Sequence, residues 1–160
     1  MSDGKKFVPK LRFPEFAERS WRAAFLKDVT AECATRNGGK FQSTSVMGVT
    51  KAEGIVPMEE RLIGTDVARY KIVRNNWFAY NPMRINIGSI ARWQGDADIL
   101  VSPDYVVFQC SEELEPDFLD QFRRSDQWQD FVNESGIGSV RVRIYYHIGR
   151  LALNLPLLPE

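Results

Sequence analysis

The chain of 160 residues is 44% apolar and 26% charged, which suits one domain with a sizeable core and excludes a disordered chain. No apolar run approaches the roughly 20 residues that a membrane-spanning helix needs, and the first residues lack the apolar stretch of a secretory signal. The net charge is zero, but residues 101–135 hold nine carboxylates against Arg123 and Arg124. This division allows a basic face opposite an acidic helix, although a solvated acidic helix on an ordinary protein explains it equally.

The N-terminal part of the chain is predicted to contain an extended lead-in and a helix. Residues 1–20 are polar and interrupted by two prolines, which is typical of extended chain. Ser20 suits an N-cap, and the apolar residues after it recur at helical spacing. We therefore predict a helix over residues 21–34, built on Trp21, Phe25, Leu26 and Val29.

A loop, a strand and a long connection are predicted next. Two glycines between basic residues indicate a flexible loop at 36–40. Residues 44–50 are predicted to form a strand. Residues 51–65 are polar and contain two glycines and a proline, so we predict a long, mobile connection.

The rest of the fold is organised around residues 70–110. Aromatic and β-branched residues dominate short runs separated by turn-forming pairs such as Asn75-Asn76 and Gly95-Asp96. These runs predict strands over residues 70–73, 77–80, 84–93, 99–101 and 105–110. The third strand alternates with period two. The core is expected to receive Ile85, Ile87 and Ile90, and the other side Arg84, Asn86 and Arg92.

Two helices and a last strand complete the prediction. The sequence Glu115-Pro116-Asp117 is a good helix start, and Ser125 suits a second cap, which gives helices over 116–124 and 126–133. Residues 140–146 alternate as a strand with Arg141 and Arg143 on one side. The predicted fold class is α+β: a mixed, mostly antiparallel twisted sheet with an N-terminal helix and two short helices before the last strands. Residues 1–20 form the lead-in and 21–160 a single domain.

Catalytic groups are scarce. Cys33 and Cys110 match no metal or redox spacing, so we expect two reduced thiols, one in a helix and one in a strand. His147 is the only histidine, so neither a zinc site nor a His-based triad is expected. Paired carboxylates suit acid–base chemistry, but two of the three clustered aspartates flank a glycine turn, where Asp is common for backbone reasons. The three are Asp96, Asp98 and Asp104.

Guanidinium, ammonium and amide groups on the predicted strands and loops are the chemistry that remains. Arg and Lys neutralise phosphates, whereas Asn, Gln and Arg also read base edges, at roughly 1–3 kcal/mol for a good contact. For any one of these residues an ordinary surface charge is the alternative. The candidate DNA-binding residues are Lys40, Lys51, Arg69, Lys71, Arg74, Asn75, Asn76, Arg84, Asn86, Arg92, Arg141 and Arg143.

Three segments in order resemble the DNA specificity subunit of type I restriction–modification systems. Residues 9–16, followed by Trp21 and residues 26–29, resemble the start of a repeat in that family. Residues 78–84 with Gly88, and then 101–108, resemble the middle of its target recognition domain. Residues 136–143, followed by 155–160, are similar to the stretch that closes the domain. Together these segments span nearly the whole chain.

The resemblance implies a target recognition domain that reads one half of a bipartite site in double-stranded DNA. It also implies assembly with a methyltransferase subunit and a restriction/translocase subunit. Those partners would use S-adenosylmethionine, ATP and magnesium, whereas this chain would bind no cofactor and catalyse no reaction. A full subunit of the family has two recognition domains separated by long helices, and this chain ends at Glu160, where such a helix would begin. We therefore expect a half-subunit or a truncated piece, and a homodimer of half-subunits stays open.

The interpretation of the residues and the family resemblance predict the same arrangement. The protein is expected to be cytoplasmic and to have no membrane partner. The sheet around residues 77–93 and 140–146 would form a platform whose edge cations hold phosphates. Loops at 36–44 and 51–69 would enter the major groove, and the acidic helices at 112–134 would face away from DNA. Two alternatives are a protein-interaction or scaffold module without DNA binding, and a small hydrolase that uses the three aspartates.

Overall fold

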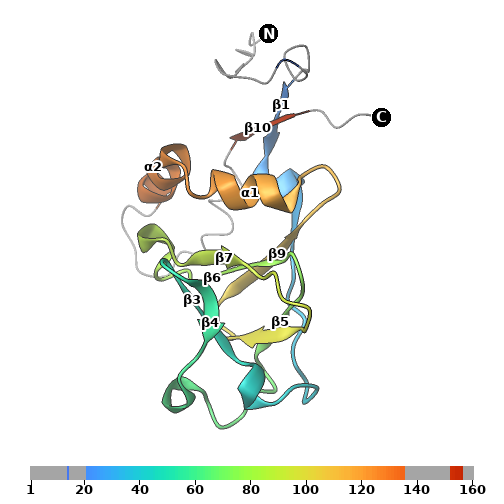
Figure 1. Cartoon of the computed structure of the whole chain (residues 1–160), viewed down its shortest axis with the longest axis vertical. Helices are drawn as coiled ribbons and strands as arrows, with labels where there is room; N and C mark the ends of the chain where they lie inside the picture. Colours follow the sequence, from blue (N-terminus) through green and yellow to red (C-terminus); the bar gives the residue numbers. More distant parts are fainter. Residues whose placement is uncertain (1–13, 15–20, 136–151, 157–160) are drawn as a thin grey trace.

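A four-stranded antiparallel sheet lies at the centre of the computed structural model, which describes residues 14, 21–135 and 152–156. Its strand order is β2–β9–β6–β7 (Figure 1). Side chains alternate between the two faces of a strand, and both faces of this sheet are covered, so β6 is buried at every position. The strands are β2 (Thr30–Glu32), β9 (Val106–Cys110), β6 (Phe78–Tyr80) and β7 (Ile90–Arg92).

Two helices cover the aromatic face of the sheet. Phe78 and Phe108 stack with ring centroids 5.2 Å apart, and Tyr80 meets Phe108 edge-on at 6.3 Å. Helices α1 (Pro116–Phe122) and α2 (Asp126–Ser135) pack on these rings with an apolar stripe that includes Leu119 and Trp128. Both helices therefore cover the face of the sheet toward which alternate residues of β6 and β9 direct their large aromatic side chains.

Two smaller sheets cover the other face. The hairpin of β3 (Met47–Thr50) and β4 (Gly54–Pro57) and the pair of β5 (Lys71–Val73) and β8 (Ile99–Val101) are both antiparallel. Their aliphatic side chains pack against the small residues of this face. That cluster includes Val49, Val73, Ala79, Ala91, Ile99, Val101 and Val107.

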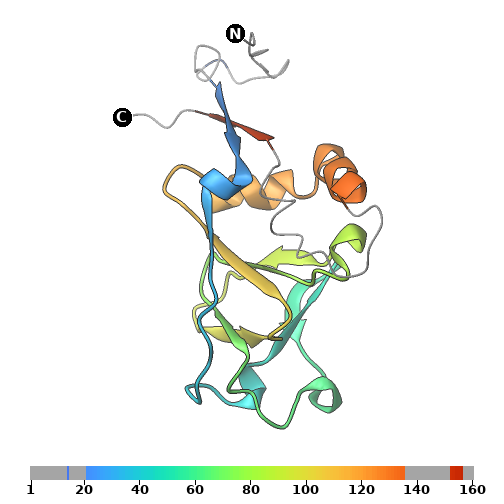
Figure 2. The same cartoon turned by 180° about the vertical axis from the view of Figure 1, so that it is seen from behind.

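A two-stranded ribbon joins the beginning and the end of the described chain. Strands β1 (Trp21–Phe25) and β10 (Ala152–Pro156) pair antiparallel, with Trp21 opposite Pro156 and Phe25 opposite Ala152. Figures 1 and 2 show this ribbon at one end of the molecule, with the helices between it and the central sheet.

The α+β class, with antiparallel sheets and two helices, is confirmed, and five of the predicted strands are found with shortened ends. The prediction of an N-terminal helix is wrong. Residues 21–34 form β1, a 3-10 turn over Leu26–Asp28, and β2, because the partner strands β10 and β9 satisfy this backbone. Cys33 follows β2 and is buried, so the prediction of a helical cysteine is also wrong.

Two further segments differ from prediction. The predicted strand 84–93 begins as a 3-10 turn over Ile85–Ile87, which Gly88 ends with a φ of +94°, and only Ile90–Arg92 is extended. Ile87 is consequently 57% exposed instead of buried. The predicted mobile connection 51–65 holds strand β4 and a 3-10 turn over Glu60–Leu62. The predicted strand at 140–146 lies outside the described residues.

Candidate nucleic-acid interface

A cavity of about 510 Å³ lies where the β3–β4 turn, the end of β7 and the C-terminal end of α1 meet. The charged residues that line it within the described chain are four cations and two carboxylates. They are Lys51, Arg92, Arg123 and Arg124, with Glu53 and Asp120. Sequence reasoning singled out two of these cations, Lys51 and Arg92, as DNA-binding candidates.

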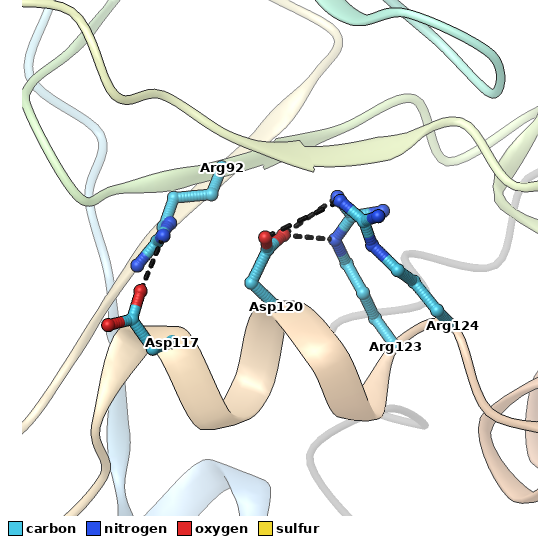
Figure 3. A network of polar contacts seen from close by, with 5 residues as sticks. All are labelled: Arg92, Asp117, Asp120, Arg123 and Arg124. Atoms are coloured by element: carbon cyan, nitrogen blue, oxygen red, sulfur yellow. Dashed lines mark hydrogen bonds and ion pairs between the residues drawn. The ribbon is translucent and has the colours of Figure 1, made fainter.

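Arg92 reaches this cavity from the last residue of β7. It shares the helix-facing side of the strand with Ile90, so its side chain extends beneath α1 and is only 6% exposed. One terminal nitrogen of Arg92 contacts Asp117 Oδ1 at 2.6 Å, and the Asp117 side chain is 76% exposed (Figure 3). The Nε–H of Arg92 is buried and has no hydrogen-bond partner in the part of the chain that the structure describes. Arg92 is thus a buried cation with one largely solvated counter-charge.

Asp120 holds two arginines at the end of α1. Arg123 donates to Asp120 Oδ1 from Nε at 2.8 Å and approaches it with a terminal nitrogen at 2.7 Å, while Arg124 lies 3.6 Å from Oδ2 (Figure 3). The three- and four-residue spacings put these side chains on one side of the helix, and cations near a helix C-terminus are favoured by its dipole. Arg124 remains 60% exposed. Sequence reasoning missed both arginines because it counted them within an acidic segment, although adjacent arginines at a predicted helix end were a visible signal.

Lys51 packs against the turn that precedes β7. A Cβ placed on Gly88 would meet Lys51 Cγ at 2.9 Å, so the lysine stem lies directly over this glycine. Ser89 Oγ donates to the carbonyl of Val49 at 2.8 Å and ties the turn to β3. The exposed candidates Arg84 and Asn86 belong to this same turn, as do Met83 and Ile87, which are 71% and 57% exposed.

The turn between β5 and β6 adjoins the cavity. Asn75 Nδ2 donates to the carbonyl of Gly95, a cavity residue, at 3.0 Å. Arg74 lies 3.7 Å from Asp98 and its guanidinium sits over the Trp77 ring, 5.4 Å from the centroid. Asn76 has a φ of +64°. The side-chain contacts of Arg74 and Asn75 therefore hold the turn and its neighbouring loop together.

Lys40 and Arg69 lie elsewhere, on the loop after β2 and on the loop before β5. Figure 1 shows these loops at the end of the molecule opposite the ribbon. Buried Asn37 joins these loops, since its Nδ2 donates to the carbonyls of Phe41 at 2.9 Å and Val67 at 3.1 Å. Lys40 and Arg69 are both exposed. Lys40 and Arg69 thus lie on two joined loops and do not line the cavity.

Lys71 is a buried candidate. Its Nζ donates to the carbonyl of Tyr105 at 2.5 Å from within the β5–β8 sheet, and the residue is 8% exposed. Arg141 and Arg143 lie outside the described residues and stay predictions. The candidates thus divide into the cavity group, the adjoining turns, the two distal loops and one buried lysine.

Metal ligands and thiols are the reactive groups that can be assessed in the described part of the chain. No three His, Cys, Asp or Glu side chains there are grouped to hold a metal ion. Burial raises the pKa of Cys110 to about 12, against an opposing effect of the Arg92 guanidinium, and burial also raises the pKa of Cys33. Both thiols therefore stay protonated near neutral pH, which disfavours a nucleophilic role. Within the same ranges, no helix has the length and apolar character to cross a bilayer.

Comparison with solved structures identifies the architecture. The crystal structure of the HsdS subunit from Thermoanaerobacter tengcongensis matches with a TM-score of 0.61 and 20% sequence identity, over 86% of this chain and 38% of that chain. This chain has the fold of one part of an HsdS subunit. A second match is a structure from work on complex assembly and conformational transition of the type I R-M system. It has a TM-score of 0.60 and 20% identity. It covers 85% of this chain and 38% of that one.

The match confirms at the level of fold the resemblance that the three segments predicted. The chain spans 38% of the length of each HsdS-like chain it matches. No protein-family model matches the sequence, and no curated protein matches it.

Proposed function

We propose that this chain is a DNA target recognition domain of a type I restriction–modification specificity subunit. It reads one half of a bipartite site in double-stranded DNA and directs a methyltransferase subunit and a restriction/translocase subunit to that site. In this proposal the chain binds no cofactor and catalyses no reaction, and S-adenosylmethionine, ATP and magnesium act on the partner subunits. The complex works in the cytoplasm, and pairing of two such chains would supply the second half-site.

The fold shared with the HsdS subunit carries this proposal. The charge distribution supports it, because the chain from residue 67 to residue 95 contains no carboxylate. The cations within that stretch are Arg69, Lys71, Arg74, Arg84 and Arg92. A continuous segment without acids avoids repulsion of the DNA backbone along the strands and turns that it forms.

Different residues in this stretch suit different parts of DNA recognition. Arg84 is exposed and suits a phosphate contact, which gives affinity without sequence information. Asn86 is also exposed, and Gln129 Nε2 donates to its backbone carbonyl at 2.9 Å, which fixes the turn beneath the amide. An amide on a fixed turn suits the bidentate contact to adenine in the major groove. Arg92 and Lys71 are too buried for a first contact with a base, so we assign them to support of the surface.

Quantitative DNA binding by the chain assembled with its partner subunits tests the proposal. A duplex selected by the wild-type complex from a random library serves as the ligand, and affinity is measured by fluorescence anisotropy over a salt series. We expect affinity to fall steeply with salt, as phosphate neutralisation requires. Arg84→Ala should weaken all duplexes alike, and Asn86→Ala should relax the preference at one base position, by about 1–3 kcal/mol. An affinity that is flat with salt contradicts the proposal.

A scaffold role without DNA binding is the second candidate. The exposed apolar pair Met83 and Ile87 favours it, because a protein partner gains from covering such side chains. Replacing both with Ser distinguishes the two functions. A scaffold would lose its protein partner and show no duplex binding in either form, whereas a recognition domain would bind duplex DNA in low salt.

A further inference from the structure

We propose that the cavity between the end of β7, the β3–β4 turn and the C-terminal end of α1 is a binding site for a phosphate group. With the proposed function as its basis, the natural ligand is a phosphodiester of the DNA backbone. The C-terminal end of α1 would then face DNA, contrary to the expectation from sequence that the helices at 112–134 face away from it. A free phosphate has the same chemistry, so the experiment below separates the two sources.

The charge balance of the site fits one phosphodiester. Its lining holds four cations against the carboxylates of Glu53 and Asp120. The exposed Asp117, which pairs with Arg92, brings the balance to four positive and three negative charges. One positive charge remains, and a phosphodiester carries one negative charge.

Buried Arg92 supplies a field that its own partner does not cancel. Its side chain is 6% exposed, but the paired Asp117 is 76% exposed and therefore largely solvated. Burial reduces the screening of a charge by water and salt. The unpartnered Nε–H adds a donor with no acceptor in the described part of the chain, and buried polar groups are otherwise nearly always paired. An anion in the adjacent cavity would be attracted by this residual charge.

Lys51 and Arg124 are the residues free to contact the anion directly. Arg124 is 60% exposed and its 3.6 Å approach to Asp120 is beyond ordinary hydrogen-bond length. Lys51 is exposed, its stem packs on Gly88, and it lines the cavity. Arg123, held at 2.7 Å by Asp120, is only 13% exposed and contributes from behind. The site therefore combines two adaptable cations with two fixed ones.

The Arg92 Nε–H resonance in a proton–nitrogen correlation NMR spectrum reports on this site directly. The full chain is titrated with inorganic phosphate in one arm and with a short duplex in low salt in the other. We expect the Arg92 resonance to shift in both arms. The double variant Lys51→Ala, Arg124→Ala should weaken phosphate binding about tenfold for each of the two cations removed. It should also lower the salt dependence of duplex binding by about one to two phosphates.

The control is Arg22→Ala, which removes one positive charge from an ion pair with Glu113 on the ribbon side. It should leave the Arg92 shift in both arms unchanged. If the Arg92 resonance moves in neither arm, or moves equally in the double variant, the proposal is overturned. A shift with phosphate while duplex DNA binds elsewhere overturns the DNA source and leaves a free-phosphate site. If no duplex binds, the proposed function fails while the phosphate arm still decides the site.

Discussion

Asp120 is expected to stabilise the domain and to oppose anion binding at the same time. In the Asp120→Asn variant the counter-charge of Arg123 disappears while the shape of the side chain is kept. Removing one partner of a buried ion pair costs about 3–5 kcal/mol. The two side chains are 9% and 13% exposed, and asparagine still offers an oxygen to Arg123, so we expect a loss of about 2 kcal/mol in the free energy of unfolding.

The same substitution should strengthen DNA binding. At an assumed separation of about 7 Å and the dielectric constant of water, Asp120 repels a phosphate by about 0.6 kcal/mol, which corresponds to about threefold in affinity at low salt, and burial would make the repulsion larger. This gain should fade as added salt screens the charge. A variant that is less stable yet binds DNA more tightly is the expected result.

Urea unfolding followed by tryptophan fluorescence gives the stability, and anisotropy with a duplex gives the affinity. The matched control is Asp98→Asn, because Asp98 lies 3.7 Å from Arg74 in a pair whose side chains are 35% and 54% exposed. Such pairs contribute about 0–1 kcal/mol. Asp120 does not have this double role if Asp120→Asn costs no more stability than Asp98→Asn, or if the variant folds normally and binds DNA more weakly.

Three further predictions concern the core, a glycine and a thiol. Phe108→Ala should cost about 3–5 kcal/mol in urea unfolding, because it removes a fully buried ring from an aromatic stack, and a loss below about 1 kcal/mol would contradict that packing. Gly88→Ala should destabilise more than Gly39→Ala, because both have φ near +90° but only the former meets Lys51, and equal losses would show that the lysine contact is irrelevant. The Cys110 thiol is protonated in the fold up to about pH 12 but ionises from about pH 9 when unfolded, so its contribution to stability should be constant below pH 9 and should decline above it. Cys110→Ser should flatten that decline in a pH series of urea unfolding curves.

The central strands and the two helices were predictable because their signals are local. Proline at the start of α1 and Ser125 before α2 mark both helix beginnings, and the runs around residues 78–80 and 106–110 are aromatic and β-branched. These strands are buried on both faces because a separate layer covers each face of the sheet. This burial cannot be predicted from any single run of residues.

The N-terminal strand was not predictable from its own sequence. Trp21, Phe25, Leu26 and Val29 fit a helical spacing, and only a partner strand more than a hundred residues away makes the segment extended. The position of Arg92 in the candidate site was likewise not predictable from local sequence. Alternation along β7 places Arg92 on the helix side, but its burial depends on α1, which β8 and β9 separate from β7 in the sequence. Arg123 and Arg124 were counted but not chosen as candidates, because the net charge of a segment does not show which of its side chains face a cavity.

The pairing of β1 with β10 brings the two polypeptide connections of the domain to neighbouring positions. Adjacent strands lie about 4.8 Å apart, and their antiparallel direction makes the backbone depart beside the point at which it arrives. The segment between β1 and β10 is therefore suited to exchange as a whole. Substituting it alters neither the spacing nor the direction of the two junctions. Chimaeras that keep residues 21–25 and 152–156 and receive the intervening segment from a protein of the same fold should therefore leave the neighbouring parts of a host protein undisturbed.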